Sequence, residues 1–451
     1  MTKKKTSNTP ELLRRNVKLL KLPIEGFDFL GRGFLRFENR NIFVPGAFPG
    51  DLVEISISGD PGDYEITEVI KQCPDRIKSD CAYFGPCQGC DLLELSEKGR
   101  KAAKIEILRV ATGSFCGDDK VTFHPFQSSP KKIRYMHRVR IHRGKKGERS
   151  ESGFLPSFDS HEKIRDGVVA VNSCALLDSA LQKRLVLARK ALSEADFPVD
   201  AIYLASSPVE PDIVTAHLCL NAKSRISQVK PFAEKVLKLV NLKGLSFGRP
   251  EKGVEGVVGE VKLAGLIAPG APKGPYFYEP SFFCQANVDQ NKALIDSIVK
   301  LGNIKEGIKI AEGFAGAGNF SIPLAALGAE VEAFESHPGA IRMGIKNIIK
   351  SGLKDKIKLN QADAFKALSK IQFSPDILLI DPPRNGVPQI GEVLKKTAPK
   401  RVFYISCDMK ALARDGQSIV RSGYKVTDIS GFDFFPRTHH VEVLVIFEKM
   451  A

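Results

Sequence analysis

KIAEGFAGAGNFSIPLA, residues 309–325, joins an apolar run to a glycine-rich turn and then to a stretch with the character of a helix start. Glycines at such a turn let the backbone approach a ligand closely, at the N-terminus of the helix that follows. The dinucleotide-binding pattern G-x-G-x-x-G, read from Gly316 and Gly318, would need a third glycine where the sequence has Ser321. The stretch therefore predicts a ligand-binding loop in an α/β fold and disfavours a nicotinamide or flavin cofactor.

Around this loop, strand-like and helical stretches alternate. The strand-like runs are IKIAEGF, EVEAFE, IKLNQAD, DILLIDPP and RVFYISC. This alternation predicts an α/β domain with a doubly wound parallel sheet. The final runs, YKVTDISGFDFFP and HVEVLVIFEK, have no helix between them, so we expect them to pair as an antiparallel edge.

The rest of the 451-residue chain divides into two further expected parts. Residues 11–75 contain short apolar runs punctuated by Gly and Pro, which predicts a small β-barrel of a kind that commonly holds single-stranded nucleic acid. Residues 76–275 should form a mixed α+β central domain, and residues 276–451 the α/β domain. The central part contains three helical patterns, EKGRKAAKIEILRVATG, DSALQKRLVLARKALSEA and QVKPFAEKVLKLVN.

The composition is basic, with 67 Lys and Arg against 52 Asp and Glu and a net charge of +15. Such a surface attracts polyanions, of which nucleic acid is the commonest, although a generically basic protein is the simpler reading. The N-terminus lacks the apolar region of a signal peptide, and no run approaches the roughly 20 apolar residues of a membrane span. We therefore expect a cytoplasmic protein without membrane association, in which the nine cysteines are not disulfide-bonded.

Two acidic residues follow the glycine loop on successive strand-like runs. Glu335 ends the first of them, where a carboxylate can hold both ribose hydroxyls of a nucleoside. Asp363 follows the second and is placed to read an adenine amino group. Together with the loop they suggest S-adenosylmethionine, whose sulfonium needs no phosphate cradle. The alternative is a helix cap and two surface acids.

Three reactive side chains are expected at the same sheet edge. Asp381 ends the run ILLID and is held by two prolines, and Cys407 ends the run RVFYIS at the start of a helical stretch. The helix dipole favours a thiolate at Cys407, whereas the neighbouring Asp408 opposes it. FFPRTHHVEVLV brings Glu442 to the start of a strand, and Arg384 stands where amino methyltransferases carry a base-stacking aromatic residue, which argues against amine methylation.

A nucleophile, a carboxylate base and a methyl donor in one cleft fit the methylation of uracil carbon 5. Carbon 5 is a poor nucleophile until a thiolate adds to carbon 6 and makes it an enolate equivalent. A base must then remove the carbon 5 proton. The alternative for Cys407 is a cysteine that only fills the core.

The motifs FCQAN, EGFAGAGNF, DPPRNG, SCDMKALARD and FFPRTHHVE closely resemble the RNA uracil-5-methyltransferases. They are most similar to the ribosomal RNA branch, which has an N-terminal TRAM barrel, an iron–sulfur centre and a class I, Rossmann-like methyltransferase domain. The resemblance covers nearly the whole chain. Glu312, Ala315 and Asp408 depart from the family pattern, and the last leaves the thiol environment open.

The resemblance implies methylation of carbon 5 of a specific uridine in 23S ribosomal RNA, with transfer RNA as the alternative substrate and a non-catalytic RNA-binding or iron–sulfur sensor protein as the alternative class. It implies Cys407 as nucleophile and Glu442 as base. It makes 23S ribosomal RNA the partner, with no obligate protein partner and a monomer by default. The residues that it places around the methyl donor are Gln285, Phe314, Gly316, Asn319, Glu335, Asp363 and Asp381.

Cys81, Cys87 and Cys90 lie within ten positions, which in a cytosolic protein predicts soft metal ligands. A fourth ligand is required. The resemblance implies that it is Cys174 and that the four hold a [4Fe-4S] cluster, while a zinc site from the same thiolates is the alternative.

The densest basic stretch, PKKIRYMHRVRIHRGKKGER, spans residues 130–149. As an extended strand it would place Arg134, Arg138 and Arg140 on one face, toward RNA phosphates, and apolar residues on the other. The alternative is a solvated basic hairpin.

Overall fold

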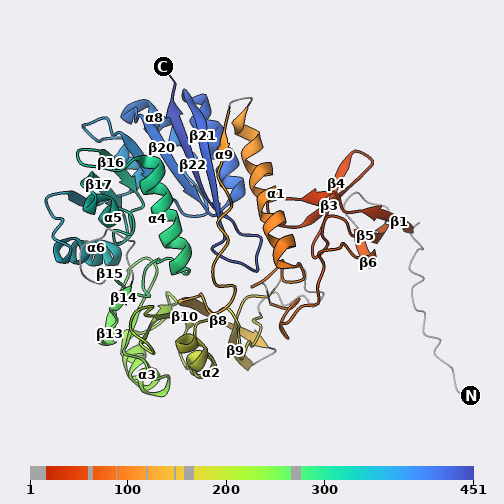
Figure 1. Cartoon of the computed structure of the whole chain (residues 1–451). Helices are drawn as coiled ribbons and strands as arrows, with labels where there is room; N and C mark the ends of the chain where they lie inside the picture. The colour runs from red at the N-terminus through yellow and green to blue at the C-terminus, as the bar shows by residue number, and fades with distance from the viewer. Residues whose placement is uncertain are drawn as a thin grey trace, which may run out of the picture.

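The computed structural model describes residues 17–58, 64–87, 89–117, 120–146, 149–156, 167–265 and 276–450. Residues 11–16, the start of the predicted first domain, lie outside this range. Three groups of strands follow one another along the chain, and Figure 1 shows the first group at the side of the molecule, joined through the long helix α1 (Glu97–Cys116) to the rest.

The first group consists of two small antiparallel sheets. β1 (Val17–Pro23), β5 (Leu52–Ser58) and β6 (Tyr64–Lys71) form one sheet, and β2 (Gly26–Phe27), β3 (Gly33–Phe37) and β4 (Arg40–Val44) form the other. Both contribute to one small apolar core, which contains Ile24, Leu35, Val44, Ala47, Val53 and Ile55. The short-strand pattern read from the sequence is confirmed.

The middle group is a six-stranded sheet with the order β13-β12-β11-β10-β8-β9. The helices α2 (Ser179–Ser193) and α3 (Ile226–Leu239) share one apolar core with it, and both match predicted helices. The two-stranded sheet of β14 (Leu263–Gly265) and β15 (Tyr276–Tyr278) follows it along the chain. The strands of the six-stranded sheet are β8 (Arg138–Lys146), β9 (Arg149–Gly153), β10 (Val199–Ser206), β11 (Val214–Leu220), β12 (Gly244–Gly248) and β13 (Gly256–Gly259).

The last group is an eight-stranded sheet with the order β18-β17-β16-β19-β20-β22-β21-β7. Its first five strands are mutually parallel, which confirms the predicted doubly wound α/β fold. The strands are β16 (Lys309–Gly313), β17 (Glu330–Glu335), β18 (Ile357–Gln361), β19 (Ile377–Ile380), β20 (Arg401–Ser406), β21 (Tyr424–Phe432), β22 (Glu442–Lys449) and β7 (Thr122–Phe123).

Helices cover both faces of this sheet, so its parallel strands are buried on both sides. One apolar core lies under α4 (Val288–Gly302), α5 (Ser321–Ala326) and α6 (Pro338–Lys350). The other lies under α7 (Ala364–Leu368), α8 (Ile390–Thr397), α9 (Met409–Arg421) and the much earlier α1. Figure 1 shows α1 alongside α9, so α1 packs on the last domain of the chain, and β7 joins its sheet by pairing with β21. The predicted domain limits themselves stay a prediction.

Two expectations were wrong. β21 and β22 pair antiparallel as expected, but β21 is not the edge, because β7 pairs with it in parallel. Arg134 lies in a bend with φ +54°, before β8 begins, and therefore does not share a strand face with Arg138 and Arg140. None of the described helices is apolar over a length that could cross a membrane.

Candidate active site

The strand order reverses at β16 and β19, since β17 and β18 lie on one side of β16 while β19 and β20 lie on the other. In open α/β sheets ligands bind outside the carboxyl ends of the strands at such a switch point. Phe314, Asp381 and Cys407 each directly follow one of these strands. The topology thus brings three of the predicted residues to one edge.

The glycine loop has a left-handed backbone at three positions. Phe314, Gly316 and Gly318 have φ values of +64°, +57° and +93°, a region that the two glycines occupy without strain and that is strained for Phe314. The loop forms one wall of a pocket. Five of the seven residues predicted to bind the methyl donor line this pocket, namely Gln285, Phe314, Gly316, Asn319 and Asp381.

The other two predicted donor residues lie outside that pocket lining. Glu335 accepts hydrogen bonds from the backbone N–H groups of Gly316, at 2.9 Å, and His337, at 2.7 Å, and so fixes the loop. Asp363 is exposed and caps α7 by accepting a 2.9 Å hydrogen bond from the Lys366 N–H. Both carboxylates retain acceptor capacity for a ligand, because each oxygen has two lone pairs.

Cys407 and Glu442 meet through strand register. β20 and β22 pair antiparallel with Ser406 opposite Val443, so the residue after β20 lies beside the residue that begins β22. Glu442 is 6% exposed. Although Glu442 is 35 residues beyond Cys407 in the sequence, the sheet places both at its ligand-binding edge.

Charge and burial act together on these groups. Burial raises the pKa of Cys407 to about 12, and the negative charges of Glu442 and Asp381 contribute to the rise, whereas the Arg384 guanidinium opposes it. Burial likewise raises the pKa of Glu442 well above its usual range and that of Asp381 to about 7. The sequence left the balance between the helix dipole and Asp408 open; in the resting protein desolvation and the nearby carboxylates outweigh the dipole and favour the neutral thiol.

Asp408, the departure from the family pattern, has a structural role here. Its side chain caps α9 by accepting a 2.8 Å hydrogen bond from the Ala411 N–H. Asp is among the preferred residues at this position. The charges of Glu442, Asp381 and Arg384 each act on Cys407 more strongly than that of Asp408, so Asp408 is a minor influence on the thiol.

A second, larger pocket of about 630 Å³ runs from the cysteine-rich segment to the reactive edge. Phe283 lines both pockets and is 72% exposed, which is unusual for a phenylalanine. Arg384 and His440 lie at the end next to Cys407. Phe283 was not predicted from the sequence; the signal that could have found it is its place in FFCQAN, two residues before the predicted donor residue Gln285.

Cys81, Cys87, Cys90 and Cys174 all line this larger pocket. Burial and the mutual proximity of the thiols raise the pKa values of Cys87 and Cys90. Among the described residues, no group of three or more His, Cys, Asp or Glu side chains has the arrangement of a metal site. The four thiols nevertheless line the same pocket, as residues that shared one thiolate-held group would.

Within the part of the chain that the structure describes, two buried donors beside the four cysteines have no hydrogen-bond partner, the Tyr135 hydroxyl and the Arg437 Nε. Tyr135 is 1% exposed and lines the same pocket, and the charge of Arg437 acts on Cys90 and Cys174. Buried donors are seldom left unpaired. A group with thiolate or sulfide acceptors would satisfy them, so the residues present fit such a group.

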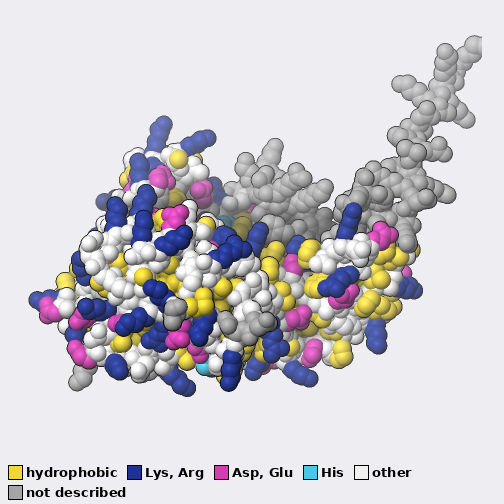
Figure 2. Space-filling model, turned by 90° about the horizontal axis from the view of Figure 1, so that it is seen from above, with side chains coloured by type: hydrophobic (Ala, Val, Ile, Leu, Met, Phe, Trp, Pro, Cys, Tyr) yellow, Lys and Arg dark blue, Asp and Glu magenta, His cyan; other side chains and the backbone are white. Residues whose placement is uncertain are grey.

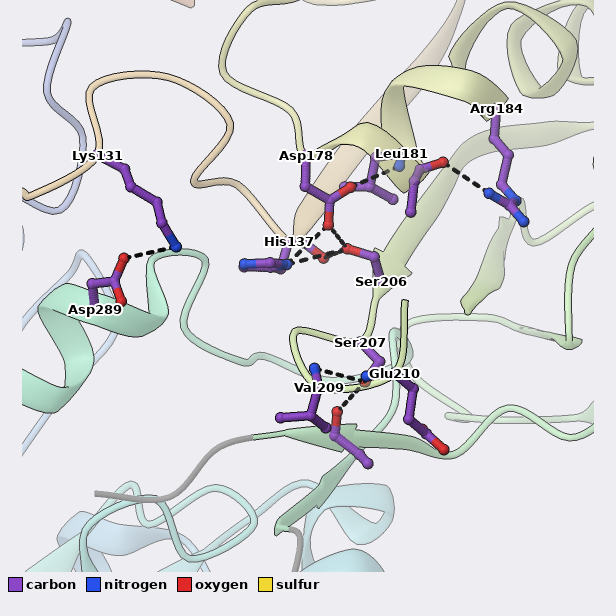
Figure 3. Close-up of polar contacts among 12 residues, drawn as sticks. Lys131, His137, Asp178, Leu181, Arg184, Ser206, Ser207, Val209, Glu210 and Asp289 are labelled. Atoms are coloured by element: carbon purple, nitrogen blue, oxygen red, sulfur yellow. Dashed lines mark hydrogen bonds and ion pairs between the residues drawn. The ribbon is translucent and has the colours of Figure 1, made fainter. Parts of the chain in front are cut away.

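The segment that carries Cys174 is tied to the middle sheet (Figure 3). Asp178 accepts hydrogen bonds from His137 Nδ1, at 2.9 Å, from the Ser206 hydroxyl, and from the Leu181 N–H, at 2.7 Å. Ser206 and His137 both contact the carboxylate, so this trio anchors α2 and does not form a nucleophile–base pair. The His137 N–H also donates to Ala286 O, next to Gln285, which connects the cysteine pocket to the donor pocket.

The basic strand β8 is only partly free. Tyr135, Val139 and Ile141 are buried, as predicted. Arg138 donates to Phe282 O at 2.6 Å and to Pro280 O at 3.2 Å, so it holds the loop before Gln285. Arg140 is exposed and stacks over Tyr203. On one face of the molecule, Lys and Arg side chains are more prominent than acidic ones (Figure 2).

Comparison with known proteins gives this geometry a family. The profile of the family described as tRNA (Uracil-5-)-methyltransferase matches residues 275–450. A protein from Dechloromonas aromatica, named 23S rRNA (uracil(1939)-C(5))-methyltransferase RlmD, is 28% identical over 444 residues, covering 94% of this chain and 98% of that protein. Residues 275–450 thus match the RNA uracil-5-methyltransferase family, and the near full-length relative is named as a member of it.

Other relatives agree with this assignment. The protein of the same name from Azoarcus sp. (strain BH72) is 29% identical over 447 residues, covering 94% of this chain and 99% of that protein. The crystal structure of the Pyrococcus abyssi tRNA (uracil-54, C5)-methyltransferase, in complex with S-adenosyl-L-homocysteine, covers 95% of this chain and 100% of that chain, with a TM-score of 0.67 and 20% identity. At that identity the likeness shows that the uracil-5-methyltransferase fold is shared.

Proposed function

We propose that this protein transfers the methyl group of S-adenosylmethionine to carbon 5 of a uridine in 23S ribosomal RNA. The observation that carries the proposal is the register of β20 and β22, which brings Cys407 and Glu442 together. The charge of Asp381, which lines the donor pocket, acts on both. The two relatives described above, which this chain matches over 98% and 99% of their length, are named for this reaction on uracil 1939 of 23S rRNA.

In the proposed reaction the Cys407 sulfur forms a bond to uracil carbon 6. The electron pair of the carbon 5–carbon 6 double bond is thereby made available at carbon 5, which attacks the methyl group of the donor. The bond from the donor sulfur to that methyl breaks, and S-adenosylhomocysteine leaves. Glu442 takes the carbon 5 proton, the double bond re-forms, and the bond from carbon 6 to sulfur breaks.

The raised pKa values fit two of these roles. Glu442, whose pKa is raised well above its usual range by burial, is a stronger base than an ordinary Glu once it is ionised. Asp381, with a pKa of about 7, is near both Cys407 and the donor pocket, and we assign it the receipt of the thiol proton as sulfur adds to the base. Arg384 favours the thiolate.

The donor would be held by the residues of the first pocket. Gln285, Phe314, Gly316, Asn319 and Asp381 would surround it, with Glu335 and Asp363 contacting the ribose and adenine from the loop side. Asn319 is already oriented, because its side-chain amide exchanges two hydrogen bonds, of 2.8 and 3.0 Å, with that of Asn291. Transfer RNA is the less favoured substrate, since the near full-length relatives are named for ribosomal RNA.

We further propose that Cys81, Cys87, Cys90 and Cys174 hold a [4Fe-4S] cluster. When bound, the cluster would cross-link residues 81–90 to the segment before α2, which shapes the larger pocket; the reaction needs no electron from it. Iron and acid-labile sulfide in the purified protein would support this proposal, and Cys87→Ser should lose both. Zinc without sulfide would show the alternative site.

The test of the function uses a 23S ribosomal RNA transcript, the protein and S-adenosylmethionine carrying a labelled methyl group. We expect one labelled 5-methyluridine, mapped by nuclease digestion and mass spectrometry, and no label with Cys407→Ala. Label on transfer RNA with none on the ribosomal transcript would refute the substrate, and label on another atom would refute the reaction.

A further inference from the structure

The chain between β21 and β22 precedes Glu442 directly and carries no regular structure from 433 to 441. In an enzyme whose base is the first residue of a strand, the backbone just before that strand sets where the carboxylate points. Segment 433–440, here named the approach segment, is held from two sides by residues that the proposed reaction does not use.

On one side, Lys104 of α1 reaches the approach segment. Its ammonium group donates to Asp433 Oδ1 at 2.5 Å, to Phe435 O at 2.8 Å and to His440 O at 2.9 Å. An ammonium group has three N–H donors, and all three are used. Lys104 is 1% exposed, and lysine is almost never buried so completely without a specific partner. One side chain, 329 residues away in sequence from Asp433, thus fixes both ends of the segment.

On the other side, the cysteine segment, residues 80–92, holds the middle of the approach segment. The Arg437 guanidinium donates to both oxygens of Asp80, at 2.9 and 3.1 Å, and the Leu92 N–H donates to Arg437 O. The His439 N–H donates to Asp91 Oδ1 at 2.7 Å. Asp80 and Asp91 flank the three proposed ligands of this segment, Cys81, Cys87 and Cys90.

We propose that Lys104 is a positioning residue for Glu442. Because the cysteine segment also holds the approach segment, a change in the structure of the cysteine segment would move the Glu442 carboxylate as well. This rests on the proposed function of Glu442 as the base. The contacts favour a role in proton removal over one in methyl transfer. Cys407 follows β20 and the donor loop follows β16, and none of the three Lys104 contacts reaches either.

The inference predicts which reaction step fails. If Glu442 is displaced, sulfur still adds to carbon 6 and carbon 5 still takes the methyl group. The carbon 5 proton then stays, so the bond from carbon 6 to sulfur cannot break, and a methylated covalent protein–RNA adduct builds up. A displacement of about 1 Å costs on the order of a hundredfold in rate. General loss of structure would instead reduce adduct and product together.

The experiment compares Lys104→Met with Lys101→Met, an exposed lysine three residues earlier on the same helix. Each variant is incubated with ordinary uridine RNA and labelled S-adenosylmethionine, then run on a denaturing gel. We expect Lys104→Met to release product roughly a hundredfold more slowly while the labelled adduct accumulates, as it should with Glu442→Gln. Lys101→Met should behave like the wild type. A folded Lys104→Met that releases product at the wild-type rate overturns the inference.

Asp80→Asn is the second variant, because the Asp80 side chain is 64% exposed and its change leaves the core intact. It weakens the hold on Arg437 and should show the same adduct with a smaller loss of rate, at unchanged iron content. If Lys104→Met does not fold, wild-type turnover by Asp80→Asn decides against the inference. No adduct with Glu442→Gln would instead refute Glu442 as the base, and the inference with it.

Discussion

The high pKa of Cys407 makes a prediction about its chemical reactivity in the free protein. A pKa of about 12 in place of the ordinary 9.0 leaves about a thousandfold less thiolate at pH 8, since each unit is tenfold. Alkylation of Cys407 by iodoacetamide should therefore be slower than that of a free cysteine by about that factor. Its rate should rise tenfold per pH unit through pH 10, where an unperturbed thiol levels off.

Glu442→Gln changes this profile with a definite sign. Below its raised pKa, Glu442 is neutral and the substitution should have little effect on the alkylation rate. Above it, the wild-type carboxylate repels the thiolate, so the variant should react faster. The increase in rate should be smaller than the roughly thousandfold that the whole pKa shift represents, because burial, the largest cause of the shift, remains in the variant. We expect an increase of about tenfold.

The assay is peptide mass spectrometry of the residue 407 peptide after timed alkylation from pH 7 to 10.5, with Cys407→Ala to identify background. Arg384→Gln should move the profile in the opposite direction, because its charge favours the thiolate. A wild-type profile that levels off near pH 8.5, or a Glu442→Gln variant that reacts more slowly at pH 10, would refute the electrostatic reasoning.

Three further predictions concern other parts of the molecule. Arg140→Gln should weaken RNA binding at low salt and lower its salt dependence by about one phosphate contact, without changing which uridine is modified. Arg138→Gln should also weaken binding of the methyl donor, because Arg138 holds the loop before Gln285. Equal effects of the two variants in RNA filter binding and in donor titration would contradict this. Phe283→Ala should lower affinity for RNA by about 1–3 kcal/mol through lost stacking, while Phe283→Tyr should not; equal affinities would rule out stacking. Glu312 is fully buried and its pKa is raised to about 8, so the stability that its neutral form provides is lost as the pH rises through 8; Glu312→Gln should melt close to the wild type at pH 5 and higher than it at pH 9, and a gap that does not widen with pH would contradict the shift.

The fold was predictable where periodicity and punctuation decide it. The alternation of runs predicted the parallel sheet, and IKIAEGF and RVFYISC each end in residues that the sheet brings to its ligand edge. α1 was predicted as a helix, but its partner was not, since an apolar stripe does not say which sheet it covers. Its packing on the last sheet is what brings Lys104 to the approach segment.

The site was predictable as a set of residue types and less so as an electrostatic environment. The thiol of Cys407 was expected to feel the helix dipole, whereas burial and two carboxylates from other strands dominate. Arg138 was expected to meet phosphates, yet backbone carbonyls of a distant loop take its donors. Sequence patterns describe neighbours along the chain, whereas both of these effects come from neighbours in space.

The central claim, a transient bond from Cys407 to the pyrimidine, is tested most directly with RNA in which the target uridine is 5-fluorouridine. Once carbon 5 carries both fluorine and methyl, it has no proton for Glu442 to remove, so the adduct cannot resolve. With S-adenosylmethionine present, mass spectrometry should find the protein joined to one methylated RNA through the peptide that contains residue 407. An adduct through any other residue, or full turnover of uridine RNA by Cys407→Ala, would contradict the account.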